Sequence, residues 1–214
     1  MKKEKKLETI LDIGLALSME KDKNKLFSLI ISKSMEITGC DAGTLYIVKD
    51  NHLEFKIMKT LSQGIDKGGA GEKIDIPPAP MREENVCAYS AIHKRVLNIE
   101  DVYSNSRFDF SGPKRYDKLT GYLTKTMLTV PLVDADDVTI GVLQMINAMD
   151  AQGKIVPFSG HSEKIIKSLA SLAAIALSNM QYKAELKAQM WSFTEAMATA
   201  IDERTPYNAN HTRK

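Results

Sequence analysis

The sequence predicts an α+β fold in which helices flank a central antiparallel sheet of five or six strands. Two pairs of segments show the alternating or largely apolar patterns of strands, and a short acidic turn joins the members of each pair. Amphipathic helical patterns stand at both ends of the chain. The order helix, helix, hairpin, loop, helix, strand, strand, helix does not alternate as a parallel doubly wound sheet requires.

The composition is that of a soluble globular protein, with 43% hydrophobic and 26% charged residues among 214. The net charge of +2 does not call for a nucleic-acid partner. The lysine-rich start at 1–6 is typical of a solvated terminus, with a membrane-surface or nucleic-acid tail as the alternative. No apolar run approaches the roughly 18 residues that span a bilayer. We expect a cytoplasmic protein in which Cys40 and Cys87 are free thiols, without membrane or nucleic-acid partners.

Elements in the first half of the chain follow from periodicity. Apolar residues at intervals of three and four predict helices over 5–20 and 24–38, and Gly39 ends the second because glycine tolerates a left-handed conformation. Segments 43–50 and 52–59 alternate in the two-residue period of a hairpin.

The middle of the chain holds a long segment rich in glycine and proline. Its composition at 60–84 predicts a loop without regular structure, either a mobile surface loop or a flap over a ligand site. After it we expect several short elements and two central strands. These are a helix at 85–94, a strand at 96–102, one or two short helices within 106–122, and strands at 125–134 and 139–147.

The last predicted helix, 159–203, is longer than one globular domain requires. Its apolar residues recur with a mean spacing of 3.5, which is typical of a coiled-coil seam. Asn179 and Lys183 interrupt the seam where one domain should give way to the next. Because the seam continues beyond the domain, we expect a homodimer through 5–20 and 165–201.

The segment 117–147, DKLTGYLTKTMLTVPLVDADDVTIGVLQMIN, is the most informative. A Thr-Gly-x-x-Thr loop, two strands joined by an acidic hairpin and a following helix resemble the GAF domains of cyclic-nucleotide phosphodiesterases and cyclases. The resemblance covers about 25–178 and implies a small-molecule sensor. It divides the chain into an N-terminal helix at 1–22, a GAF sensor domain at 23–178, and a linker helix with the start of another domain at 179–214.

The resemblance also implies a set of ligand-binding residues. In nucleotide-binding members the threonines of the loop line the pocket, and here they correspond to Thr120 and Thr124. Asp117 and Gly121 fit the same pattern, and Gln144 stands where the family places a Glu or Gln beside the nucleotide. The alternative is that Thr120 caps a turn and Gln144 pairs within the sheet.

The cyclic-nucleotide subset carries an Asn-Lys-Phe-Asp-Glu signature, of which this chain keeps only part. It has Asn147, Phe158 and Glu163, but Ala148 replaces the Lys and Ser162 replaces the Asp. Both halves of the family's ion pair are therefore missing together, and a neutral pair can replace a partly buried ion pair without loss of stability. A nucleotide or another small metabolite remains the expected ligand, without strong preference for cyclic GMP or cyclic AMP.

Chromophore binding fits the sequence less well. A bilin-binding member attaches its pigment to a Cys that is usually followed by His, but Cys87 precedes Ala88 and Cys40 precedes Asp41. A haem site needs a buried axial His, and the only mid-domain candidate, His93, is expected to be solvated.

The C-terminal residues AMATAIDERTPYNANHTRK resemble the opening of an HD or HD-GYP phosphohydrolase domain. By that resemblance His211 is a possible metal ligand in a longer parent protein, and Asp202 is the acidic residue of the preceding helix. The chain has no His-Asp pair to complete a metal site that activates water. We therefore expect no catalytic residues and no complete metal site in this chain.

Together these observations predict a regulatory, ligand-sensing GAF domain of a bacterial signalling phosphodiesterase of the HD or HD-GYP type. It would transmit its ligand state through the flanking helices. The alternative is a dimerisation module of the same parent that binds no ligand.

Overall fold

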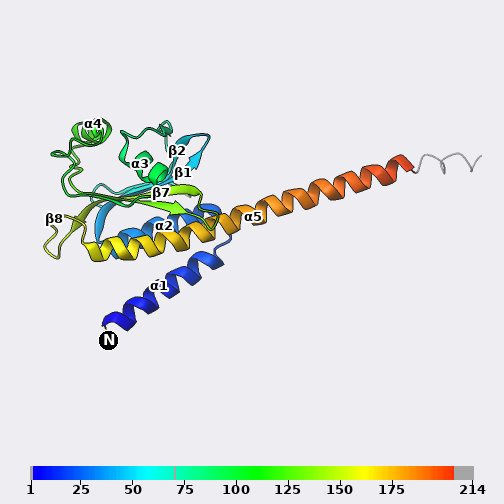
Figure 1. The fold of residues 1–214 in the computed structure, drawn as a ribbon, viewed down its shortest axis with the longest axis horizontal. Coiled ribbons are helices and arrows are strands. Elements are labelled where there is room, and N and C mark those ends of the chain that lie inside the picture. The colour runs from blue at the N-terminus through cyan, green and yellow to red at the C-terminus, as the bar shows by residue number, and fades with distance from the viewer. Residues whose placement is uncertain (1, 70, 205–214) are drawn as a thin grey trace, which may run out of the picture. The chain divides into compact units, whose positions relative to one another are not determined.

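The computed structural model describes the backbone of residues 2–69 and 71–204 and the side chains of residues 10–69 and 71–201. The chain divides into two compact units, Met1–Leu177 and Ser178–Lys214. The first unit contains the predicted antiparallel sheet with helices on both faces (Figure 1). Within the described residues, no helix is both long and apolar enough to cross a membrane.

The sheet follows the strand order β3-β2-β1-β7-β6-β5, and every neighbouring pair is antiparallel. Two short strands lie off this path, β4 beside β2 and β8 beside β7. The strands are β1 Cys40–Lys49, β2 His52–Thr60, β3 Ile65–Gly68, β4 Ala79–Pro80, β5 Leu97–Ile99, β6 Met127–Val133, β7 Thr139–Met149 and β8 Ile155–Val156.

Within residues 2–69 and 71–204, five helices accompany the sheet, each near its predicted position: α1 Lys2–Met19, α2 Lys23–Thr38, α3 Val86–His93, α4 Ser111–Thr120 and α5 Gly160–Arg204. Local chemistry sets the bounds of α2. The Asp22 side chain accepts a hydrogen bond from the Lys25 amide at 2.9 Å, and Gly39 ends the helix at φ 61°.

One face of the sheet is covered by α2 and the first part of α5 (Figure 1). At Gly43 in β1 an added Cβ would lie 3.0 Å from both Ile31 and Met35 of α2, so the missing side chain lets this helix approach closely. The α1 helix reaches α5 at Gly14, where an added Cβ would lie 3.2 Å from Leu172.

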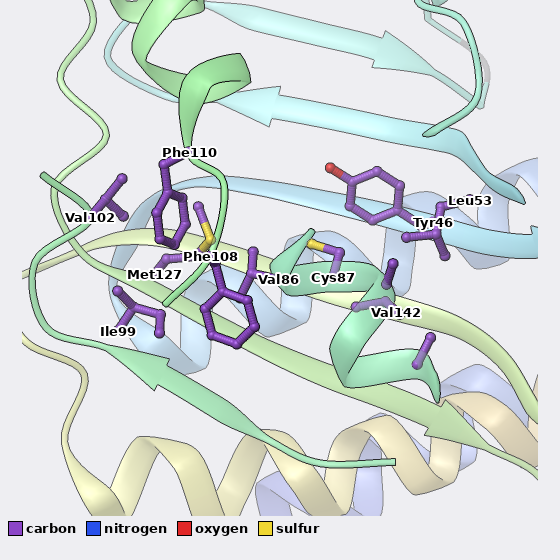
Figure 2. Packing of buried hydrophobic residues seen from close by; sticks show 12 residues of the cluster. Tyr46, Leu53, Val86, Cys87, Ile99, Val102, Phe108, Phe110, Met127 and Val142 are labelled. Atoms are coloured by element: carbon purple, nitrogen blue, oxygen red, sulfur yellow. The ribbon is translucent and has the colours of Figure 1, made fainter. Parts of the chain in front are cut away.

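The opposite face carries α3, α4 and the long connecting segments (Figure 1). A buried hydrophobic cluster fills the space beneath them (Figure 2). Its members come from the sheet, from α3 and from the 99–110 segment: Tyr46, Leu53, Val86, Cys87, Ala88, Ala91, Ile99, Val102, Phe108, Phe110, Met127 and Val142.

The prediction that 60–84 lacks regular structure was wrong in part, because this segment contributes β3 and β4 to the edge of the sheet. A Cβ added at Gly68, where φ is 86°, would lie 2.0 Å from the Lys56 carbonyl oxygen. This glycine therefore permits the close approach of two strands rather than interrupting one.

The second unit begins at Ser178 and contains the C-terminal part of α5. Its described side chains are almost all exposed, including large apolar ones such as Leu186, Met190, Trp191, Phe193 and Met197. Residues 205–214, which carry the resemblance to an HD domain and include His211, lie outside the described residues, as does the side chain of Asp202.

Candidate functional site

A cavity of about 380 Å³ lies over the α3 face of the sheet in the first unit. Strands β1, β6 and β7 supply polar and apolar lining residues, including Thr44, Tyr46, Met127, Gln144 and Ile146. Further lining residues come from β2, from the 60–84 segment, from α3 and from α4 with the residues flanking it. They include Ile76, Phe110, Arg115, Tyr116 and Leu119. The walls of this cavity are largely apolar.

Gln144 lines the cavity together with a tyrosine from the neighbouring strand. The Tyr46 hydroxyl donates to Oε1 of Gln144 at 3.0 Å, and Nε2 of Gln144 lies 3.1 Å from the sulfur of Met127. A thioether is a weak acceptor, so the buried amide keeps donor capacity for a better partner. Burial raises the pKa of Tyr46 well above its usual value, which keeps the hydroxyl protonated.

Thr124 also lines the cavity, and Asp117 holds it from behind. The backbone amide of Thr124 donates to Oδ2 of Asp117 and its hydroxyl donates to Oδ1, both at 2.8 Å. The Tyr103 hydroxyl donates to Oδ2 at 2.8 Å, and this hydrogen bond raises the pKa of Tyr103. Asp117 is buried and does not line the cavity, so in this structure it positions Thr124.

Thr120 and Gly121 form the turn at the end of α4 instead of lining the cavity. The Thr120 hydroxyl donates to the Tyr116 carbonyl at 2.9 Å and accepts from the Tyr122 amide at 3.3 Å. Gly121 takes φ 70°, and its amide donates to the Asp117 carbonyl at 2.9 Å. These contacts match the alternative given in the sequence analysis, in which Thr120 caps a turn.

Asn147, at the end of the same strand as Gln144, fixes the chain segment that carries Thr124. Its Oδ1 accepts from the amides of Lys125 and Thr126 at 2.8 and 3.1 Å. Its Nδ2 donates to the Leu123 carbonyl at 2.5 Å and to the Tyr122 hydroxyl at 3.1 Å. Four hydrogen bonds from one buried amide therefore set the position of one cavity wall.

The two positions that lack the family's ion pair are neutral here. Ala148 is buried in β7, and the Ser162 amide donates to the Ser159 hydroxyl at 3.0 Å at the start of α5. The retained Glu163 lies 3.5 Å from the side-chain amide of Asn98, which also donates to the Phe158 carbonyl at 2.9 Å. Hydrogen bonds from Ser162 and Asn98 thus hold the segment at the start of α5 in place of an ion pair between positions 148 and 162.

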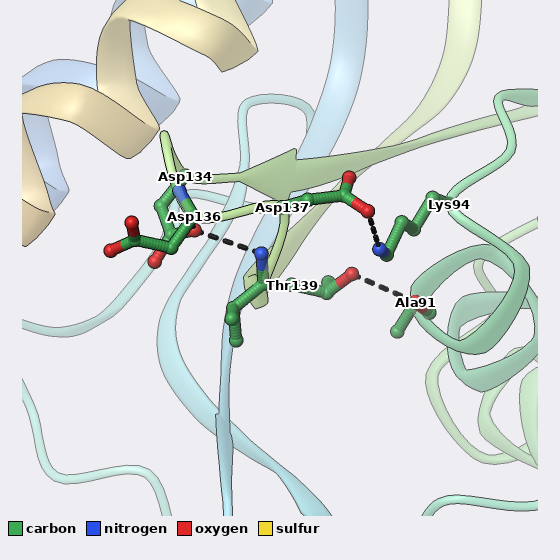
Figure 3. A network of polar contacts seen from close by, with 7 residues as sticks. Ala91, Lys94, Asp134, Asp136, Asp137 and Thr139 are labelled. Carbon is green, nitrogen blue, oxygen red and sulfur yellow. Dashed lines mark hydrogen bonds and ion pairs between the residues drawn. The ribbon is translucent and has the colours of Figure 1, made fainter.

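The α3 helix, which contributes Val86 and Cys87 to the cavity, is tied to the β6–β7 hairpin at its far end (Figure 3). The Thr139 hydroxyl donates to the Ala91 carbonyl at 2.9 Å, and Lys94 pairs with Asp137. These contacts make the cavity's α3 wall continuous with the central sheet.

The same cavity brings in residues that the sequence did not single out. Tyr46 is the foremost of them, since it bonds directly to Gln144. The alternation of the predicted 43–50 strand puts Tyr46 on the same face as Thr44, so the two-residue period of the strand could have indicated Tyr46 as a lining residue. Arg115 and Tyr116 line the cavity from α4, which the sequence placed only as an unspecified short helix. His93, the rejected haem ligand, is exposed and lies 3.1 Å from Glu83.

Both cysteines are free and buried. Burial raises the pKa of the Cys40 thiol from 9.0 to about 11 and shifts that of Cys87 in the same direction. Because only the thiolate is nucleophilic, neither thiol is suited to covalent attachment of a pigment near neutral pH.

The thiols give an alkaline-stability prediction. The unfolded chain loses the Cys40 proton near pH 9, whereas the folded chain keeps it to about pH 11, so unfolding becomes easier between these values. Between pH 8 and pH 11 the free energy of unfolding should fall less in Cys40→Ala than in the wild type. The difference between the two losses should be roughly 2 to 3 kcal/mol. Urea unfolding at several pH values measures this, and parallel pH profiles would contradict it.

Comparison with known proteins identifies the fold. The GAF domain family model matches residues 22–177. The chain belongs to the GAF domain family. A GAF domain structure from a phosphoenolpyruvate-protein phosphotransferase of Coxiella burnetii superimposes with a TM-score of 0.63 at 14% identity, covering 84% of this chain and 96% of that one. At this identity the likeness concerns the fold alone.

Curated relatives of this GAF domain include cyclic-nucleotide phosphodiesterases. The dual 3',5'-cyclic-AMP and -GMP phosphodiesterase 11A of Takifugu rubripes is 36% identical over 98 residues, which are 46% of this chain and 10% of the relative. The dual phosphodiesterase 11 of Drosophila melanogaster is 26% identical over 187 residues, which are 81% of this chain and 12% of the relative. The chain spans about a tenth of these relatives, and as a GAF domain it is regulatory rather than catalytic.

Proposed function

We propose that this GAF domain senses a small molecule in the cavity above β1, β6 and β7. The observation that carries the proposal is the buried amide of Gln144. Among the described residues its Nε2 has no hydrogen-bond partner but the sulfur of Met127, within a cavity of about 380 Å³. Native proteins satisfy buried polar groups, and a ligand acceptor would satisfy this one better than a thioether. A volume of this size suits a metabolite or a nucleotide.

The ligand state is transmitted through the flanking helices to an output domain in a longer parent protein. Two observations support a signalling phosphodiesterase as that parent. The chain covers only 10% and 12% of its phosphodiesterase relatives, and its last residues resemble the start of an HD or HD-GYP domain. The buried free thiols fit a cytoplasmic setting, where such residues stay reduced. On this view the GAF domain is 23–178 and the linker begins at 179.

A thermal-shift panel of nucleotides and metabolites tests for a ligand. At about 100 times its dissociation constant, a ligand that binds only the folded state stabilises it by roughly 2.7 kcal/mol. Because Ala148 and Ser162 replace the two charged residues of the family's ion pair, the domain should show no strong preference for cyclic GMP or cyclic AMP. Tight binding of either would overturn that part of the proposal.

For the compound that gives the largest thermal shift, we expect Thr124→Ala and Gln144→Ala each to weaken binding by about 1–3 kcal/mol, because each change leaves a buried ligand group without its partner. Calorimetry measures the affinities. Thr38→Ala is a matched control, since Thr38 is a buried threonine that bonds to the Ser34 carbonyl in α2 and does not line the cavity. Unchanged affinity in both cavity variants would place the binding site elsewhere.

A ligand-free dimerisation module is the second candidate. The observation that favours it is the row of exposed apolar side chains in the second unit, Leu186, Met190, Phe193 and Met197, at intervals of four, three and four residues. A second copy of this chain suits such a row, because the spacing is that of a self-pairing seam. Dimer formation together with no thermal shift across the panel would support this candidate over the first.

A further inference from the structure

We propose that Asp117 makes Thr124 a hydrogen-bond acceptor toward the cavity, so that the site selects a ligand bearing an N–H or O–H group there. The inference rests on the proposed function and adds the chemical class of the ligand. It also states in which direction the hydrogen bond between Thr124 and the ligand runs.

The hydrogens of Thr124 are already committed. Its hydroxyl hydrogen goes to Oδ1 of Asp117 and its amide hydrogen to Oδ2, each across 2.8 Å. A carboxylate has no hydrogen to return, so only the lone pairs of the Thr124 oxygen remain for a ligand. Tyr103 adds a third donor to Asp117 at 2.8 Å, which holds the carboxylate in place.

An anionic or carbonyl oxygen placed against Thr124 would therefore meet lone pairs, with the Asp117 carboxylate directly behind them. A ligand N–H or O–H would instead complete a chain of hydrogen bonds that ends on a negative charge, the stronger kind of hydrogen bond. At Thr124 the cavity therefore favours a ligand group that donates a hydrogen bond and disfavours one that can only accept.

The opposite polarity is found at Gln144. The Tyr46 hydroxyl hydrogen is committed to Oε1 of Gln144, while Nε2 of the same amide donates to the sulfur of Met127 and, in the part of the chain that the structure describes, to no other group. Gln144 can therefore donate to a ligand carbonyl or ring nitrogen. With apolar lining from Phe55 and Phe110, this part of the cavity fits a flat lactam or amide-bearing heterocycle that has one donor and one acceptor.

Asp117→Asn tests this arrangement with minimal change of shape. Its Oδ can accept from the Thr124 amide and from Tyr103, as Oδ2 of Asp117 does. Its Nδ2 then takes the place of Oδ1 and donates to the Thr124 hydroxyl oxygen. The Thr124 hydrogen is released toward the cavity, and the wall changes from acceptor to donor.

Two probe molecules of nearly identical shape can show whether the Thr124 hydroxyl accepts or donates a hydrogen bond toward the cavity. Quinolin-2(1H)-one carries a ring N–H beside a carbonyl, and coumarin has a ring oxygen in place of that N–H. We expect the wild type to bind quinolin-2(1H)-one about tenfold more tightly than coumarin, the effect of one hydrogen bond lost and one repulsion gained. In Asp117→Asn the preference should vanish or invert. Calorimetry or ligand-observed NMR titration measures both affinities.

Asp41→Asn is the matched control. Asp41 is also buried and accepts from one residue's amide and hydroxyl, those of Ser62 at 2.9 and 2.7 Å, and neither residue lines the cavity. Burial and Asp41 together raise the pKa of Tyr122, which does line the cavity, but an asparagine oxygen at position 41 can still accept from that hydroxyl. This variant should keep the wild-type preference. The same loss of preference in Asp41→Asn and Asp117→Asn would overturn the inference, because the effect would then be a general one of removing a buried charge.

A measurement without ligand separates this inference from the proposed function. In threonine-labelled protein in mixed H₂O and D₂O, slow exchange of the Thr124 hydroxyl splits its Cβ resonance. Splitting in the wild type and its loss in Asp117→Asn are expected, because the released hydroxyl faces the cavity. Rapid exchange in the wild type, equal affinity for the two probes, or binding of neither probe would overturn the inference. The metabolite panel would still decide separately whether the domain binds a ligand.

Discussion

Asn147→Ala is expected to destabilise the GAF domain by about 3–5 kcal/mol, because the Asn147 side chain satisfies several backbone groups at once. The change removes four hydrogen bonds and leaves the Lys125 and Thr126 amides and the Leu123 carbonyl without their partner. Each backbone group that is left buried and unpaired costs about 1–3 kcal/mol. Asn147 also has φ 58°, a region that asparagine tolerates better than alanine. Urea unfolding of the two proteins measures the difference.

Asn51→Ala is the matched control for the backbone contribution. Asn51 has φ 59° in the β1–β2 turn, and its side chain is exposed. Its replacement should cost only the left-handed strain, about 1 kcal/mol. If the Asn147 variant lost no more stability than the Asn51 variant, the four hydrogen bonds would be shown to contribute little. The same segment carries Tyr122 and Thr124, so a folded Asn147 variant should also bind any cavity ligand less tightly.

Local patterns were sufficient to predict the elements whose determinants lie within a few residues. The β1–β2 hairpin is one case: two alternating strands meet at Asp50 and Asn51, and both take positive φ as a tight turn requires. The α2 helix is another, because Asp22 and Gly39 cap it from the adjoining sequence. In both, propensity and tertiary structure favour the same conformation.

The strand β3 was missed because its determinants are not local. Its four residues pair with the edge of β2, and Gly68 is needed where β3 passes close to Lys56. Read from the sequence alone, the glycines of 64–71 indicate a loop, since they remove side chains without showing what approaches the backbone. The pairing of β3 with β2 shows why Gly68 is needed there.

The site was predictable only as far as family resemblance reaches. It indicated Thr124 and Gln144, which line the cavity, but also Thr120, whose hydroxyl closes a helical turn. Asp117 was a candidate ligand contact from its pattern, whereas its carboxylate accepts from Thr124 and Tyr103. A sequence pattern fixes which residues are near a site, but the direction of each hydroxyl hydrogen depends on contacts between distant segments.

Replacing Leu186 and Phe193 by glutamate is expected to convert a dimer of twice 23.8 kDa into a monomer at micromolar concentration. In the second unit these side chains are 58% and 67% exposed, and Met190 and Met197 lie on the same helical face. An apolar stripe of this length is unusual on the surface of a monomer and marks an association site. Burying four charges in the paired helices would weaken association by at least about a hundredfold.

The control pair Ala184→Glu and Ala188→Glu adds the same charge on the opposite side of the same helix, because 100° per residue turns these positions away from the stripe. Light scattering of the three proteins should then report dimer for the wild type and the control, and monomer for the seam variant. A monomeric wild type would remove the dimer proposal, and monomers in both variants would assign the effect to charge rather than to the seam.

Leu11 and Leu15 of α1 are 63% and 61% exposed at an interval of four residues, so α1 presents a comparable surface in the first unit. If the dimer persists in the seam variant, Leu11→Glu with Leu15→Glu should abolish it, because pairing would then depend on the N-terminal helix.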